Sequence, residues 1–134
     1  MISISTPEND GASSEDNTMD TTRIPTDQLA TRFDRFTKQF LLRESTNTAD
    51  IEILVPEWGD QFATEGARLR GITYDSKEKA IEFYVEGGDH RVVRPQEVWT
   101  EEEPDGFIKA IEIVREDATR EVVRVNRLGI RPIT

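Results

Sequence analysis

The spacing of apolar residues changes near residue 45, and this change limits the folds that the chain can form. Four apolar residues recur at steps of four, three and four: Leu29, Phe33, Phe36 and Phe40. This spacing places them on one face of an α-helix. Beyond residue 47, apolar and polar residues alternate instead, which is typical of β-strands with one buried face. We therefore expect an α+β fold in which an N-terminal amphipathic helix packs on an antiparallel β meander.

The helix is expected over residues 24–43, because Pro25 and Asp27 suit a helix start and residues 44–47 have turn chemistry. Turn-forming segments divide the rest of the chain into strands at a spacing of roughly eight to twelve residues. The expected strands cover residues 51–55, 69–74, 80–86, 90–94, 108–115 and 120–125. Residues 62–65 form either a short strand or a bent connector, and residues 97–100 continue or restart the strand at residues 90–94. The sheet either curls around the helix or closes partly into a small barrel.

The N-terminal residues form a separate segment by composition. Residues 7–22 contain one Met, one Ala and no other apolar side chain, and residues 1–20 contain five acids and no Lys or Arg. Such a stretch cannot bury enough apolar area to offset the entropy lost on ordering. We expect a disordered-type acidic arm over residues 1–22, a single α+β domain over residues 23–126, and a C-terminal extension over residues 127–134.

Charge and cysteine content exclude several classes of protein. The net charge is −10, and an acidic surface repels the phosphates of nucleic acids. The chain has no cysteine, which excludes disulfides and thiolate metal sites and favours a cytoplasmic setting. No window approaches the eighteen apolar residues of a membrane-spanning helix. We expect a soluble cytoplasmic protein with protein partners, without nucleic acid and without a transmembrane segment.

Catalytic motifs are sparse in this chain. His90 is the sole histidine, and a catalytic or sensing imidazole is weighed against a turn histidine bonded to a neighbouring strand. The acidic run at residues 101–106 lacks the ligand spacing of a calcium loop and is interpreted as a solvated hairpin turn. No Gly-rich phosphate loop or nucleophile motif is present. The sequence predicts no enzyme activity, no catalytic, cofactor-binding or metal residue, and no cofactor.

Candidate contact residues lie in a loop, on a strand and at the two ends of the chain. Exposed tryptophans anchor interfaces, although a tryptophan that covers the core is the alternative. The last twenty residues contain five arginines and no lysine, which favours either an arginine-rich docking strip or a charged edge strand with a frayed end. The candidate interaction residues are Ile2, Ile4, Trp58, Trp99, Arg124, Arg127, Leu128, Ile130 and Arg131.

One block of the chain has a specific pattern, which consists of Gly59-Asp60-Gln61, Glu65, Leu69 and the run Gly71-Ile72-Thr73-Tyr74-Asp75. This block resembles that of a family of small bacterial proteins of unknown function. In that family an aromatic helix precedes the block, and a histidine, a proline and a last hairpin follow it. Those places are held here by Phe33 and Phe36, His90, Pro95 and residues 111–125. The last turn departs from the family, with Asp117-Ala118-Thr119 where Asp-Gly-Thr is expected. The resemblance covers residues 24–126 and implies a fold without an established activity.

Three functional hypotheses follow. The leading one is a non-catalytic accessory subunit or adaptor that docks on a larger protein complex through its extended termini, for example at the cytoplasmic face of a respiratory or photosynthetic membrane complex. An arm that orders only on binding requires such a partner. The second is a stand-alone small-ligand-binding or stress-related domain, with its ligand near His90, Tyr84 and Trp99. The third is an enzyme of unrecognised type.

Overall fold

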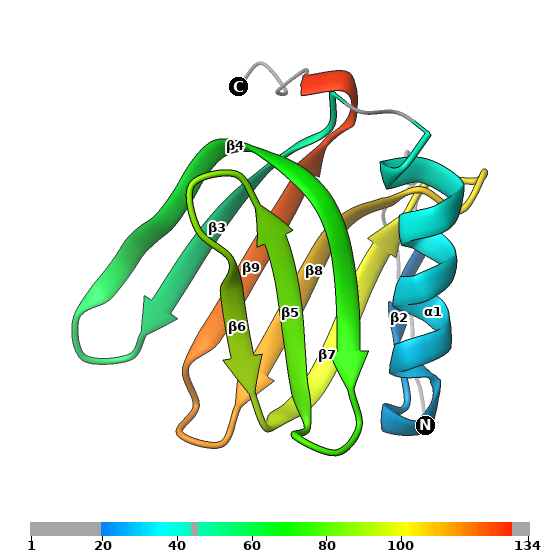
Figure 1. The fold of residues 1–134 in the computed structure, drawn as a ribbon. Helices are drawn as coiled ribbons and strands as arrows, with labels where there is room; N and C mark the ends of the chain where they lie inside the picture. Colours follow the sequence, from blue (N-terminus) through cyan, green and yellow to red (C-terminus); the bar gives the residue numbers. More distant parts are fainter. Residues whose placement is uncertain (1–19, 44–45, 130–134) are drawn as a thin grey trace, which may run out of the picture.

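Strands dominate the computed structural model, which describes residues 20–43 and 46–129 (Figure 1). They account for 57% of the described residues, whereas helical segments account for 18%. The strands are β2 (Asp20–Arg23), β3 (Thr48–Val55), β4 (Gly59–Asp75), β5 (Ala80–Val85), β6 (His90–Val93), β7 (Pro95–Glu102), β8 (Ile108–Arg115) and β9 (Arg120–Asn126). The helical segments are η2 (Thr26–Gln28), α1 (Leu29–Phe36), η3 (Thr37–Leu41) and η4 (Arg127–Gly129).

The expected α+β fold, an N-terminal amphipathic helix packed on an antiparallel β meander, is wrong. The chain forms a curled antiparallel half-barrel with one short α-helix, and its strand order is β2-β7-β8-β9-β3-β4-β5-β6. Two meanders, β3 to β6 and β7 to β9, are joined because β3 pairs with β9 along its length, from Thr48↔Asn126 to Leu54↔Arg120. Alternation within one strand does not specify which distant strand will pair with it, so this connection was not visible in the sequence.

The longest strand, β4, bends the sheet. Residues 59–68 pair with β3, and residues 69–75 pair with β5. The register shifts within both pairings, and near the first shift Gly66 has a φ of 66° and donates its N–H to the Asp50 carboxylate at 2.7 Å. Bulges of this kind increase local twist and bend a strand, so β4 arches over the half-barrel (Figure 1). Residues 62–65, expected as a short strand or a bent connector, and residues 69–74, expected as a separate strand, are therefore parts of one strand.

The helical stripe predicted from the sequence lies in the core. All four of its side chains are buried, namely Leu29, Phe33, Phe36 and Phe40. The rings of Phe36 and Phe40 each pack edge-on against Phe107, with ring centres 5.3 Å apart in both pairs. One hydrophobic cluster includes these rings and inward-facing residues of β3, β4, β5, β8 and β9. The short helix therefore shares a single core with both meanders.

Thr37 holds the helical segment against β4. Its hydroxyl accepts a hydrogen bond from the N–H of Ile72 and donates one to the C=O of the same residue, both at 3.0 Å. Ile72 lies in the half of β4 that has β5 on one side, so Thr37 supplies hydrogen bonds where a neighbouring strand would otherwise do so. Thr37 also begins a single π-helical turn, a feature that is rare within helices.

Candidate functional site

One row of side chains crosses the outside of the sheet, with an aromatic residue at each end of the five strands. The row consists of directly opposed residues on five neighbouring strands: Phe62, Glu52, Val122, Glu112 and Trp99. Opposed residues of antiparallel strands project on the same face, and this face lies opposite the core. Phe62 is 55% exposed, and Val122 and Trp99 are half-buried. We call this side of the sheet the outer face.

A shallow hollow of about 300 Å³ lies on the outer face. It is lined by Thr21, Trp99, Thr100, Glu101, Ala110, Ile111, Glu112, Val122 and Arg124. The fold thus brings together Trp99 and Arg124, which the sequence identified as separate candidates. The indole N–H of Trp99 donates to Glu97 at 3.0 Å, and Arg124 pairs with Glu52 at 3.2 Å. Both candidates are therefore held in place by neighbouring carboxylates.

Acids outnumber arginines on the outer face. The two rows beside the first are Asp60-Leu54-Arg120-Val114-Glu97 and Asp50-Arg124-Ala110-Glu101-Thr21, and Arg23 extends the first row beyond Trp99. Together the three rows hold six acids and three arginines. Two of these arginines pair with acids of the same face, Arg124 with Glu52 and Arg120 with Glu112. The face is therefore mixed, with a net negative charge and apolar side chains between the charged ones.

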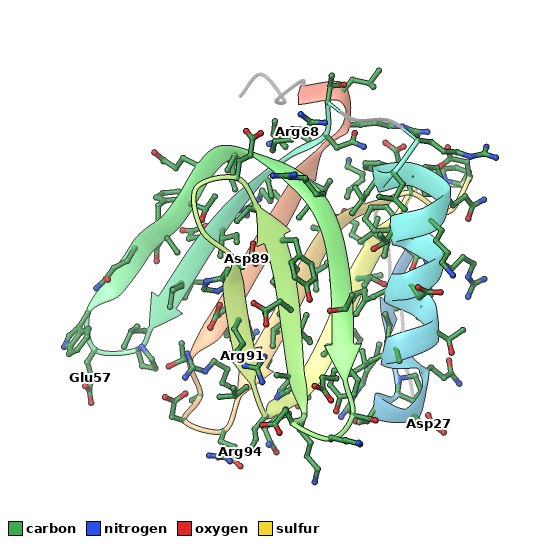
Figure 2. All side chains as sticks on the ribbon, in the orientation of Figure 1. Asp27, Glu57, Arg68, Asp89, Arg91 and Arg94 are labelled. Atoms are coloured by element: carbon green, nitrogen blue, oxygen red, sulfur yellow. The ribbon has the colours of Figure 1, made fainter. Side chains whose placement is uncertain are left out.

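The hairpin that joins β3 to β4 projects from the body of the protein, and we call residues 53–66 the arm (Figure 1). Its tip is a turn with Pro56 at the second position, in which the N–H of Trp58 donates to the C=O of Val55 at 3.1 Å. Gly59 follows with a φ of 79°, a left-handed conformation that favours glycine. Trp58 is 72% exposed. Figure 2 labels the adjacent Glu57 at the same tip.

His90 belongs to a partly buried cluster around the carboxylate of Glu121. Its Nε2 lies 2.5 Å from one carboxylate oxygen of Glu121, and Arg115 donates to the other at 3.1 Å. The side chain of Glu121 is 2% exposed, and a buried carboxylate requires such partners. The cluster connects β6 to β8 and β9. Sequence reasoning missed Glu121, although its inward position in the alternation of β9, beside Val123 and Val125, was a usable signal.

Arg127 occupies an anchored position between the acidic turn and the aromatic core. Its guanidinium donates to Glu103 at 3.0 Å and to Asp105 at 2.9 Å. It also lies 4.5 Å from the centre of the Phe107 ring and 5.2 Å from that of Phe40, which is the geometry of a cation–π contact. The backbone N–H of Phe107, and then Arg127, hold the pKa of Asp105 below its usual range. Arg127 is therefore held in place both by two carboxylates and by two aromatic rings.

Comparison with known proteins identifies the family. Residues 20–129 match a family described as a family of unknown function (DUF5335). The chain belongs to this family. It is also 35% identical over 108 residues to an uncharacterized protein of Aquifex aeolicus (strain VF5), an alignment that covers 80% of this chain and 93% of that relative. No solved structure matches. The resemblance to a bacterial family of unknown function is therefore confirmed, and the family carries no assigned activity.

In this member of DUF5335, the residues of the small-ligand hypothesis do not converge. Tyr84 lines a groove of about 490 Å³ beside η3, together with Arg70 and Asp89. Trp99 lines the hollow on the outer face. His90 is engaged with Glu121 and lines neither depression. These residues lie at different places on the half-barrel.

Several predictions concern residues that have no described position or no functional grouping. Ile2, Ile4, Ile130 and Arg131 lie outside the described residues. Leu128, which is described, is 53% exposed. Within residues 20–43 and 46–129, no three His, Asp or Glu side chains gather as metal ligands would. Over the same ranges, no helix has the length and apolar character needed to cross a membrane.

Proposed function

We propose that this protein is a non-catalytic, protein-binding adaptor that contacts a larger assembly through its outer face and arm. The observation that carries this proposal is the row from Trp99 through Val122 to Phe62 on the side of the sheet away from the core. Exposed aromatic residues surrounded by polar ones are typical anchors of protein interfaces. The excess of acids on the outer face favours a partner with a basic surface.

The proposal includes the cytoplasmic setting and the docking role of residues 1–22 that the sequence predicts. A cysteine-free composition supports the setting, and the cytoplasmic face of a membrane complex is one place for such an adaptor. Deletion of residues 1–19 tests the docking role separately from the outer face, because it keeps β2, whose Thr21 lines the hollow on that face. If the complex is lost on deletion, the deleted N-terminal residues contribute to binding. If the complex is unchanged, the folded domain binds the partner by itself.

Site-specific photo-crosslinking in the native cell tests the outer face directly. A photoreactive amino acid replaces Phe62 or Val122 in two variants, and Leu42 in a matched control. Leu42 is a 65% exposed residue that follows η3, away from the outer face. We expect the same partner protein to be cross-linked from Phe62 and from Val122, but not from Leu42. Cross-links that are absent from the first two positions, or equal from all three, contradict the proposal.

A second candidate function, small-ligand binding, is supported by the groove beside η3. Arg70, Tyr84 and Asp89 supply polar groups around this groove, and Gly71 contributes to its lining. A Cβ at Gly71 would lie 3.5 Å from Thr37 and 3.6 Å from Tyr84, so a larger side chain there would fill the groove. Thermal-shift screening of metabolite mixtures on the wild type and on Gly71→Val tests this function. A ligand that stabilises both proteins equally does not bind in the groove.

A further inference from the structure

The first half of β4 has an open edge. One side of residues 59–68 is occupied by β3, and β5 pairs only with residues 69–75. In the described part of the chain, no strand pairs with the other side of residues 59–67. Backbone N–H and C=O groups alternate in direction along an antiparallel strand, so about half of those in this stretch point toward the open side. An edge of this kind is a template for pairing with another strand.

The acids along this edge differ from those of the neighbouring strands. Asp60 and Glu65 on β4, and Glu57 in the turn before it, are exposed, and none of them forms an ion pair with a described residue. By contrast, Glu52 on β3 pairs with Arg124, and Glu112 on β8 pairs with Arg120. The open edge therefore combines peptide groups that lack a strand neighbour with negative charges that lack a cation. Phe62, 55% exposed, lies between these acids.

We propose that the open edge of β4 receives an extended segment of a partner protein that carries Lys or Arg, as an added β-strand. This inference rests on the proposed adaptor function and specifies how the partner binds. In strand addition, main-chain hydrogen bonds provide affinity and alternate side chains provide specificity. A residue of the added strand opposite Phe62 extends the aromatic row by one strand, and basic residues on either side of it face the unpaired acids.

A second copy of this chain fits the edge less well than a basic segment. Antiparallel pairing of two such edges would bring the acids of one copy near those of the other, and like charges across a strand pair are unfavourable. The net charge of −10 adds to this repulsion. The register of β4 against β3 shifts between Phe62 and Thr64 and again near the left-handed Gly66, so the regular part of the receptive stretch is residues 59–62. The chemistry of the edge therefore selects a short, extended and basic occupant.

Peptide selection on the full-length protein tests the mode of binding. The probe is a random phage-displayed library of peptides of about twelve residues, selected on the immobilised protein. We expect enrichment of peptides in which Lys or Arg alternates with apolar residues. In ¹⁵N-labelled protein, such a peptide should shift and protect backbone amides within residues 59–66. The peptide has two sets of alternate amides, and only one set faces β4. N-methylation of that set should weaken binding by about tenfold, whereas N-methylation of the other set should leave binding unchanged.

A charge reversal at the edge, with a matched control, completes the test. Asp60→Lys together with Glu65→Lys should weaken the selected peptides by about tenfold or more. Glu78→Lys together with Glu116→Lys makes the same change of charge in two hairpin turns away from this edge and should have little effect. Dispersed amide spectra establish that both variants are folded. Asp60→Asn with Glu65→Gln removes the charge more mildly and should give an intermediate loss.

The outcomes separate this inference from the proposed function. No enrichment, enrichment of acidic peptides, or amide shifts outside residues 59–66 overturns strand addition at β4, and indicates that the bulge and the acids protect the edge. If this happens while Phe62 and Val122 still cross-link to a partner, the adaptor function stands and its binding mode is wrong. If selected peptides occupy the edge but those cross-links are absent in cells, the edge can bind an added strand and the proposed adaptor function is wrong.

Discussion

The imidazole of His90 lies 2.5 Å from the carboxylate of Glu121, although the two residues are 31 positions apart in the chain. His90 begins β6, which pairs through its backbone only with β5 among the described strands. Glu121 lies on β9, in the other meander, and its second oxygen binds Arg115. The contact therefore links the edge strand β6 to β9 on the other side of the half-barrel. Because the carboxylate of Glu121 is buried, the loss of either partner should destabilise the fold.

His90→Ala should lower the free energy of unfolding by about 1–3 kcal/mol, because Glu121 loses one of its two polar partners in a buried site. Urea denaturation measures this change. Arg91→Ala, on the same strand with a 43% exposed side chain, serves as the control and should cost less than about 1 kcal/mol. When Glu121 is already replaced by Gln, His90→Ala should lower the free energy of unfolding by less than it does in the wild type. Equal losses for His90→Ala and Arg91→Ala would show that the cluster adds no particular stability.

Arg127→Lys should destabilise the fold by about 1 kcal/mol even though the charge is kept. A lysine ammonium does not reproduce the planar guanidinium that binds Glu103 and Asp105 while lying over Phe107. Arg124→Lys is the matched control, because Arg124 is 54% exposed and pairs with one acid, Glu52, among the described residues. Chemical denaturation compares the two variants. If the free energy of unfolding falls by the same small amount in both variants, the contact of the Arg127 guanidinium with Phe107 adds no stability of its own.

Asp105 should contribute to the acid dependence of stability. Its folded-state pKa is lowered, first by the N–H of Phe107 and then by Arg127. Folding therefore favours the charged form, so the contribution is complete above the ordinary aspartate pKa and is lost as pH falls through the lower, folded-state pKa. Asp105→Asn should be less stable than wild type at neutral pH and should converge toward it in strongly acidic buffer. Urea denaturation at several pH values checks this, and a constant difference would refute it.

Asp117 provides a comparison for the acid experiment. Its pKa is also lowered, chiefly by the backbone N–H of Thr119, so the direction of its pH dependence is the same. Its carboxylate accepts that N–H at 3.0 Å in the exposed β8–β9 turn. Asp117→Asn should therefore show convergence with wild type in the same acidic direction, without any contribution from Arg127. Combining Arg127→Ala with each variant should alter the Asp105 result and leave the Asp117 result unchanged.

Thr37→Val should cost about 1–3 kcal/mol of stability, because the N–H and C=O of Ile72 both lose their side-chain partner at nearly constant volume. Thr37→Ser keeps the hydroxyl and should retain most of the stability. Hydrogen exchange at the Ile72 amide gives a local measurement, since its protection should fall in the valine variant alone. Unchanged protection in Thr37→Val would show that the hydroxyl does not control this part of β4.

Ala118→Gly should stabilise the protein by about 1 kcal/mol. Ala118 has a φ of 71° in the turn between β8 and β9, a left-handed conformation that strains a residue with a Cβ. The family resemblance also leads to the expectation of glycine here, since Asp117-Ala118-Thr119 stands where Asp-Gly-Thr is expected. Ala30→Gly, at an exposed position of α1, is a control with the opposite expected sign. Thermal and chemical denaturation measure both, and a destabilised Ala118→Gly would contradict the strain argument.

Local features of the fold were readable from the sequence. The helical stripe from Leu29 to Phe40 is buried as its spacing predicted, and Ile81, Phe83 and Val85 are the inward-facing residues of β5. Pro56 ends β3 as expected, and residues 76–79 form the turn between β4 and β5. These features depend on side chains within a few positions of one another. Short-range periodicity and turn chemistry therefore suffice to predict them.

Long-range features were decided by the tertiary structure. The pairing of β3 with β9, the addition of β2 to the edge beside β7, and the bend that makes β4 one strand were not predictable from alternation. Many strands of this chain share the same period of two, so their local patterns do not distinguish one partner from another. The alignment of Phe62 with Trp99 follows from that pairing, and the contact of Glu121 with His90 follows from the packing of the two meanders. The sequence by itself determined which residues turn inward and where the chain turns, whereas the packing of distant strands around one core decided which residues meet.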